Sequence, residues 1–70
     1  MEGMTIRIER IRRGLTQTEL AKRLGVSQEL VSKLERGIYQ TSNETSKKIR
    51  QLFKDMDKGD GNANTNIRDL

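Results

Sequence analysis

The chain has 70 residues and a net charge of +4, from 14 Lys and Arg against 10 Asp and Glu. It has no Cys and no His, which excludes disulfides, thiolate metal sites and most nucleophilic triads, so we expect neither an enzyme nor a cofactor or metal. One Phe and one Tyr argue against the stacking surfaces of single-strand binders, and no apolar run approaches the roughly 18 residues of a membrane span. A cytoplasmic protein with no membrane partner is expected.

The first predicted helix covers about residues 5–13, judged from apolar periodicity. Met4, Ile8, Ile11 and Leu15 recur at the spacing of one helical face and are expected to form its buried side. Gly14 follows as a left-handed stop.

The second predicted helix opens with Thr16-x-x-Glu19, the spacing of a capping box, and ends at Gly25. Its inner side consists of Leu20, Ala21 and Leu24.

The third predicted helix is capped by Ser27 and ends at Gly37. Its two sides do not overlap at 100° per residue. The apolar side holds Leu30, Val31 and Leu34, and the polar side holds Gln28, Glu29, Ser32, Lys33 and Arg36.

The fourth predicted helix begins after a loop, with either Thr41 or Ser42 as its cap, and is expected to fray near Asp57. Its apolar face consists of Ile49, Leu52, Phe53 and Met56. Residues 58–66 are rich in Gly and Asn and have no apolar period, which is typical of disorder. We therefore predict an all-α, compact four-helix domain over residues 1–57 and a flexible tail over residues 58–70, with a fifth helix in residues 62–70 as the alternative.

The positive charge lies in the predicted domain. Residues 1–54 hold twelve Lys and Arg against six Asp and Glu, whereas residues 55–70 hold two against four. A basic domain attracts polyanions through release of counterions from phosphate, and an ordinary solvated surface is the alternative reading of the charge.

Two short helices joined by a tight glycine turn, with the small Ala21 where they cross, form a helix-turn-helix pattern. The segments GLTQTELAKRLGVS (residues 14–27) and LVSKLERG (residues 30–37) resemble the phage repressor and Cro-type helix-turn-helix domains of XRE-like transcriptional regulators. The resemblance implies an all-α domain that binds double-stranded operator DNA, usually as a two-fold dimer. A repressor of phage or mobile-element type is the expected function.

The resemblance also implies roles for individual residues. Gln28 matches a position that reads adenine while braced by Gln17, and Glu29 and Lys33 match further base-reading positions. By the chemistry of base edges, Lys33 suits guanine and Glu29 suits cytosine. The implied base readers are Gln28, Glu29, Ser32 and Lys33. The implied DNA-backbone contacts are Thr16, Gln17, Arg36, Tyr39, Thr41, Ser42 and Asn43.

Arg10 and Glu35 match an ion pair between the first and third helices of several phage repressors. Glu35 falls at the border of the apolar side, where an unpaired carboxylate would be costly, so we expect the pair to form.

The family's fifth helix, which forms its dimer seam, corresponds here to the Gly/Asn-rich tail. The alternatives for a homodimer are a seam at Phe53 and Met56, one at Ile67 and Leu70, or pairing only on DNA. The absent seam and the acidic Glu29 also fit a second function, a protein-interaction module that modulates another regulatory protein.

Overall fold

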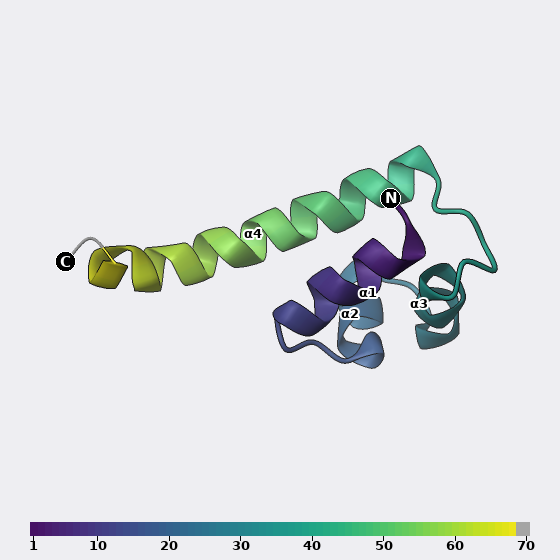
Figure 1. Ribbon diagram of the computed structural model, residues 1–70, viewed down its shortest axis with the longest axis horizontal. Coiled ribbons are helices and arrows are strands. Elements are labelled where there is room, and N and C mark those ends of the chain that lie inside the picture. The colour runs from purple at the N-terminus through teal and green to yellow at the C-terminus, as the bar shows by residue number, and fades with distance from the viewer. Residues whose placement is uncertain (69–70) are drawn as a thin grey trace.

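The computed structural model describes the backbone of residues 1–68 and the side chains of residues 1–58. This part of the chain forms four helices and no strand, which confirms the all-α fold class. The helices are α1 (Gly3–Arg12), α2 (Gln17–Leu24), α3 (Gln28–Glu35) and α4 (Asn43–Arg68). In Figure 1, α1, α2 and α3 gather beside the first half of α4, and the rest of α4 extends past them.

The turn between α2 and α3 follows from local sequence. The Thr16 hydroxyl accepts from the Glu19 amide at 3.0 Å and the Glu19 carboxylate accepts from the Thr16 amide at 2.8 Å, which is the predicted capping box. Gly25 has φ +76°, a backbone conformation in which a Cβ is costly, and α2 ends there. Ser27 then accepts from the Leu30 amide at 3.1 Å, so only residues 25–27 separate α2 from α3.

The core is drawn from all four helices and the loop after α1. Leu20 and Ile49 are fully buried at its centre, and Ala21, 2% exposed, is the small residue predicted in the wedge between α2 and α3. The remaining buried apolar residues are Ile6, Leu15, Val31, Leu34 and Phe53.

The predicted inner face of α1 is wrong. Met4, Ile8 and Ile11 are 59%, 49% and 54% exposed, and the helix instead buries Ile6 and Arg10. Apolar periodicity cannot count an arginine as a core residue, yet the buried partner of Arg10 on α3 determines how α1 is rotated. Leu15, the last residue of the predicted face, is buried as expected.

Two contacts bind the start of the chain to the rest of the domain. The Met1 ammonium donates to the Ser46 hydroxyl of α4 at 3.0 Å. Gly3 lies so close to the end of α3 that a Cβ there would overlap the carbonyl oxygens of Leu34 and Glu35. A glycine is therefore required where α1 crosses α3.

The fourth helix begins as one of the two alternatives predicts and ends later than expected. The Ser42 hydroxyl accepts from the Thr45 amide at 3.1 Å, so Ser42 is the cap. The backbone continues as helix to Arg68, past the expected end near Asp57. The side chains of residues 59–70, including Ile67 and Leu70 of one proposed seam, lie outside the described residues, and the flexible tail stays a prediction.

Candidate nucleic-acid interface

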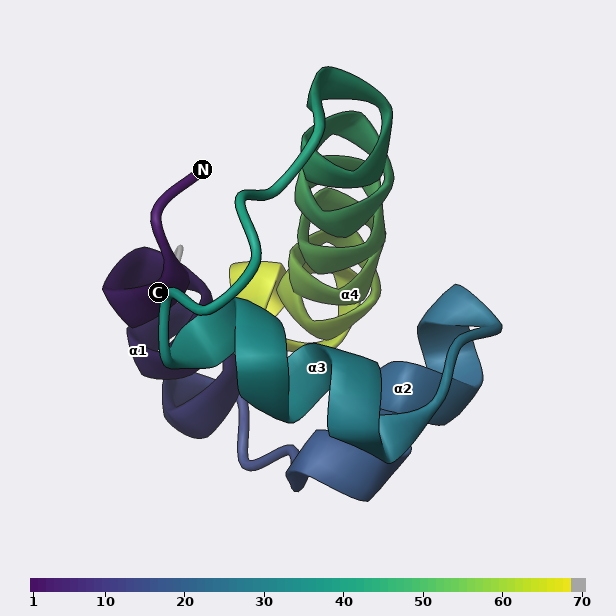
Figure 2. The same cartoon turned by 90° about the vertical axis from the view of Figure 1, so that its right-hand side faces the viewer.

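The outer side of α3 presents the predicted base readers together. Val31 and Leu34 hold the inner side of this helix in the core, which turns the alternate positions outward. Gln28, Glu29 and Arg36 are exposed, and Ser32 and Lys33 are half-buried. Figure 2 shows α3 lying across the front of the domain, with α1 and α2 on either side of it. An exposed polar helix side of this kind has the dimensions that enter a DNA major groove.

A chain of three side chains leads from this surface into the core. The Gln28 amide nitrogen donates to the Gln17 amide oxygen at 2.6 Å, and the Gln17 nitrogen donates to the Glu35 carboxylate at 3.1 Å. A carboxylate only accepts, so Gln17 must turn its nitrogen toward Glu35 and its oxygen toward Gln28. Gln28 must then use one amide hydrogen on Gln17, which leaves its other hydrogen and its oxygen free.

The chain ends at a buried ion pair between α1 and α3. Arg10 donates through Nε and Nη2 to the two Glu35 oxygens at 2.6 and 3.0 Å, and through Nη1 to the Leu15 carbonyl at 2.7 Å. Their side chains are only 10% and 2% exposed. Glu35 therefore accepts from both Arg10 and Gln17, and no described buried side-chain nitrogen or oxygen lacks a partner. Hydrogen bonds through Gln17 thus connect the ion pair to Gln28.

Lys33 has two neighbours on the same surface. Its ammonium lies 3.6 Å from the Glu29 carboxylate, one helical turn earlier, and 5.3 Å from the centre of the Tyr39 ring. These groups line a shallow hollow of about 300 Å³ beside Ser27 and Leu30. The i,i+4 spacing could have predicted the contact with Glu29, but no local pattern predicts that the loop after α3 returns Tyr39 to Lys33.

The predicted backbone contacts occupy two separate places. Thr16 and Gln17 stand at the start of α2, where Thr16 forms the capping box with Glu19 and Gln17 contacts Gln28. Ser42 and Asn43 lie at the other end of the loop, where Ser42 caps α4 and Asn43 is its first residue. Tyr39 is the predicted loop contact that lies against α3, with its ring near the Lys33 ammonium and its amide donating to the Lys33 carbonyl at 3.4 Å. Thr41 is half-buried.

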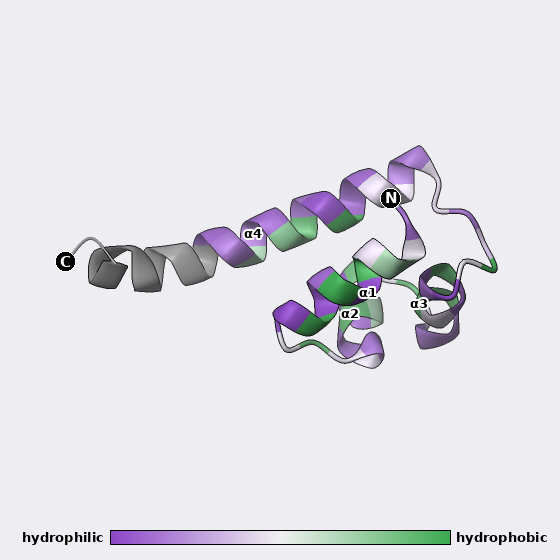
Figure 3. Ribbon diagram, in the orientation of Figure 1, coloured by the Kyte–Doolittle hydropathy of each residue, from purple (hydrophilic) through white to green (hydrophobic). Residues whose placement is uncertain are grey.

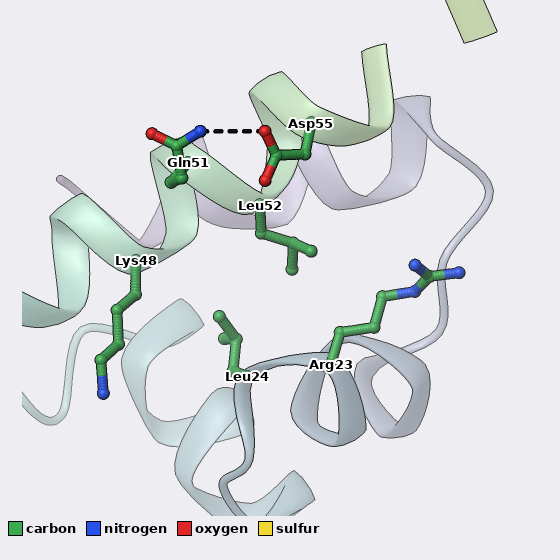
Figure 4. Close-up of a pocket in the computed structure, with 6 residues that line it drawn as sticks. All are labelled: Arg23, Leu24, Lys48, Gln51, Leu52 and Asp55. Atoms are coloured by element: carbon green, nitrogen blue, oxygen red, sulfur yellow. Dashed lines mark hydrogen bonds between the residues drawn. The ribbon is translucent and has the colours of Figure 1, made fainter. Parts of the chain in front are cut away.

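A different hollow lies between α2 and α4. In Figure 4, Leu24 and Leu52 point toward each other across a cleft of about 330 Å³, with Arg23 and Lys48 beside them. Asp55 at its rim accepts from Gln51 at 2.9 Å. Its charges are mixed and it contains none of the predicted base readers.

The residues that the structure describes contain no group of acidic side chains placed to hold a metal ion, and none of their helices has the length and apolarity to cross a membrane. The comparisons give one family. A model described as Helix-turn-helix matches residues 6–56, which include most of α1, all of α2 and α3, and the first half of α4. No curated protein and no solved structure matches the chain significantly.

Proposed function

The chain belongs to the XRE-type helix-turn-helix family of DNA-binding regulators, and from that premise we propose that it is a sequence-specific transcriptional repressor of phage or mobile-element type. It reads the major groove of duplex operator DNA with the outer side of α3. Two copies bind a palindromic operator, which gives each copy the same half-site.

The observation that carries this proposal is the fixed direction of the Gln28 amide. Its free oxygen and its remaining hydrogen match the N6 donor and N7 acceptor of adenine in the major groove. Because Glu35 sets that direction through Gln17, the amide meets the base already oriented, and little rotamer freedom is lost on binding. Lys33 is a donor suited to guanine, and Glu29 is an acceptor suited to the cytosine amine.

The first experiment is selection of bound duplexes from a random pool. We expect a palindrome with half-site centres about 10 bp apart, one turn of B-DNA. The affinity of the selected duplex should fall with salt at a log–log slope of roughly −5 to −9 for two bound copies. An unselective pool, or half-sites without two-fold symmetry, would contradict the proposal.

Variants then separate base readers from phosphate contacts. Gln28→Ala or Lys33→Ala should each cost about 1–3 kcal/mol on the selected duplex and relax the preference at one base pair. Arg36→Ala, at an exposed position expected to contact phosphate, should weaken selected and random duplexes alike. Gln17→Ala should weaken random duplex and weaken the selected duplex further, because the Gln28 amide loses the neighbour that orients it. Lys54→Ala is the charge-matched control, since Lys54 is exposed on α4 away from α3. Equal losses on selected and random DNA for Gln28→Ala and Lys33→Ala would show that these residues do not read bases.

The interaction-module function remains the second candidate because Glu29, 75% exposed in its side chain, presents a carboxylate to any approaching phosphate. An electrophoretic shift assay with random duplex at about 50 mM salt distinguishes the two functions, since nonspecific phosphate binding is strongest at low salt. No shift under these conditions would favour the interaction module.

A further inference from the structure

We propose that the outer side of α1 is a docking surface for an amphipathic helix of a partner protein, one with a stripe of apolar side chains flanked by Asp or Glu. The surface, called the α1 stripe here, consists of Met4, Ile8 and Ile11. It is separate from the DNA-reading surface, and the proposal does not depend on DNA binding.

The α1 stripe gathers large apolar side chains on one side of one helix. All three are about half exposed or more, at 59%, 49% and 54%, and they follow the spacing i, i+4, i+7. They extend over about 10 Å of helix, or two turns. Exposed apolar residues scattered singly are ordinary, but a contiguous stripe is typical of an interaction surface.

The rotation of α1 cannot be changed to bury this stripe. Gly3, Ile6 and Arg10 define the opposite side of the helix, where Gly3 touches α3, Ile6 is 1% exposed and Arg10 is bound to Glu35. Turning the stripe inward would expose Ile6 and break the buried ion pair. The stripe therefore faces outward for as long as the domain is folded.

The charged residues beside the α1 stripe indicate which kind of partner helix would bind there. At 100° per residue the stripe lies within about 40° of Met4, and the exposed Arg7 and Arg12 lie about 60° and 80° from Met4 on its two sides. Glu9 is turned to the inner border of α1, where it accepts from Arg12 at 3.1 Å and from Arg13 at 2.8 Å. The outer side thus presents an apolar stripe bordered on one edge by the Arg7 guanidinium and on the other by the Arg12 guanidinium, which also binds Glu9.

A second copy of the chain is a poor occupant, because two α1 helices packed antiparallel across the stripe would set Arg7 against its own copy. Duplex DNA offers phosphates to the arginines and little to the apolar stripe. A helix with its own apolar stripe and acidic flanks satisfies both, and it can pack along α1 as ridges into grooves. The short contact predicts a weak, transient complex.

The partner and DNA occupy different sides of the molecule. Figure 3 shows hydrophobic bands along α1 in the middle of the view, whereas α3 lies to the right. Since α1 contacts α3 through its inner side, its outer side points away from the base readers. A partner docked on α1 leaves the surface of α3 open.

The test measures binding of dye-labelled synthetic helical peptides to the full chain by fluorescence anisotropy. One peptide of 21 residues carries Leu residues spaced alternately three and four positions apart, with Glu on both sides of this apolar stripe. The matched peptide carries Lys in place of each Glu. We expect the acidic peptide to bind at least tenfold more tightly than the basic one. The combined variant Met4→Gln, Ile8→Gln and Ile11→Gln should weaken the acidic peptide at least tenfold, with its melting temperature and affinity for random duplex unchanged.

Two further variants make the test specific. Arg7→Glu with Arg12→Glu should reverse the preference to the basic peptide. Ile38→Gln removes another exposed apolar side chain, 55% exposed, and should leave peptide binding unchanged. Equal or absent binding of the two peptides would overturn the proposal. A large drop in the melting temperature of the triple Gln variant would also overturn it, because the chain would then cover its own stripe. Self-association in sedimentation that this variant abolishes would overturn it too, because a second copy would then be the occupant.

Discussion

At the scale of single residues, the buried pair of Arg10 and Glu35 joins stability to recognition. It closes α1 onto α3, and it also orients Gln17 and, through Gln17, the amide of Gln28. If α3 binds DNA as proposed, substitution of Arg10 or Glu35, which lie behind Gln17, should alter how Gln28 meets a base.

Removing one member of the pair should be severely destabilising. Arg10→Ala leaves a buried carboxylate without its main partner, and we expect a loss of about 3–5 kcal/mol in the free energy of unfolding, measured by urea denaturation. The double variant Arg10→Met with Glu35→Leu removes both charges and should recover most of that loss. Arg12→Ala, which breaks an exposed pair, is the control and should cost at most about 1 kcal/mol. An unchanged midpoint for Arg10→Ala would mean that the pair does not hold α1 to α3.

Glu29 is expected to increase the selectivity for the operator sequence, because its carboxylate repels the phosphates of any duplex. Glu29→Gln removes a carboxylate that phosphates repel, so random duplex should bind about fivefold more tightly, the equivalent of about 1 kcal/mol. The preference for cytosine at the contacted base pair should weaken at the same time. Titrations of random and selected duplex measure both effects. Weaker binding of random duplex would show that Glu29 instead holds Lys33 in place.

At the scale of helices, the sequence predicts α2 and α3 well because their signals are local. The capping box at Thr16, the positive φ at Gly25 and the Ser27 cap depend on residues within one turn. The rotation of α1 depends on contacts made 25 residues apart, such as Arg10 with Glu35, which no helical period records. Apolar periodicity therefore wrongly places Met4, Ile8 and Ile11 in the core.

The same reasoning applies to the candidate site. The outward side of α3 follows from its apolar period, and the resemblance proposed both Gln17 beside Gln28 and the ion pair. The hydrogen bond from Gln17 to Glu35 and the approach of Tyr39 to Lys33 could not be predicted, since both arise from how separate segments pack.

The crossing of α1 over α3 gives a prediction at this scale. On helix propensity alone, Gly3→Ala should stabilise α1 by about 1 kcal/mol. Because the added Cβ overlaps two backbone carbonyl oxygens of α3, we instead expect a net loss of about 1–3 kcal/mol in thermal or urea unfolding. Thr5→Ala, at an exposed position of the same helix, should change stability by less than about 0.5 kcal/mol. A stabilised Gly3→Ala variant would contradict the close approach of the two helices.

At the scale of the whole molecule, one charged contact connects the end of α1 to the middle of α4. Arg13 donates through Nε and Nη2 to the Asp57 carboxylate at 2.9 and 2.5 Å, and its guanidinium lies 4.4 Å from the centre of the Phe53 ring. Hydrogen bonds from Arg13 lower the pKa of Asp57 and of Glu9 below their ordinary values, and a hydrogen bond from the Thr16 amide does the same for Glu19.

These lowered pKa values predict how stability depends on pH. A carboxyl group with a lowered folded-state pKa stabilises the fold above its unfolded value and loses that contribution as the pH falls through the folded value. The ordinary values are 4.5 for Glu and 3.8 for Asp, so the melting temperature should be level above about pH 5 and fall below about pH 4. The composition contains no His to titrate nearer neutrality.

Asp57→Asn tests which groups cause the expected fall in melting temperature below about pH 4. It should lower the melting temperature at pH 7 slightly and make the fall below pH 4 shallower than in the parent chain. Asp57 and Glu19 are exposed and Glu9 is only partly buried, so added salt should weaken the effect. A steep loss of stability already between pH 7 and 5 would point to a group other than these three.

The ammonium of Met1 has a practical consequence for these measurements. It donates to Ser46, and the Met1 side chain packs against the core beside Phe53. A bulky group attached at Met1 would crowd the place where residue 1 contacts Ser46 of α4. Reporter groups should therefore be attached at the opposite terminus, or the melting curves would record the fusion together with the substitution.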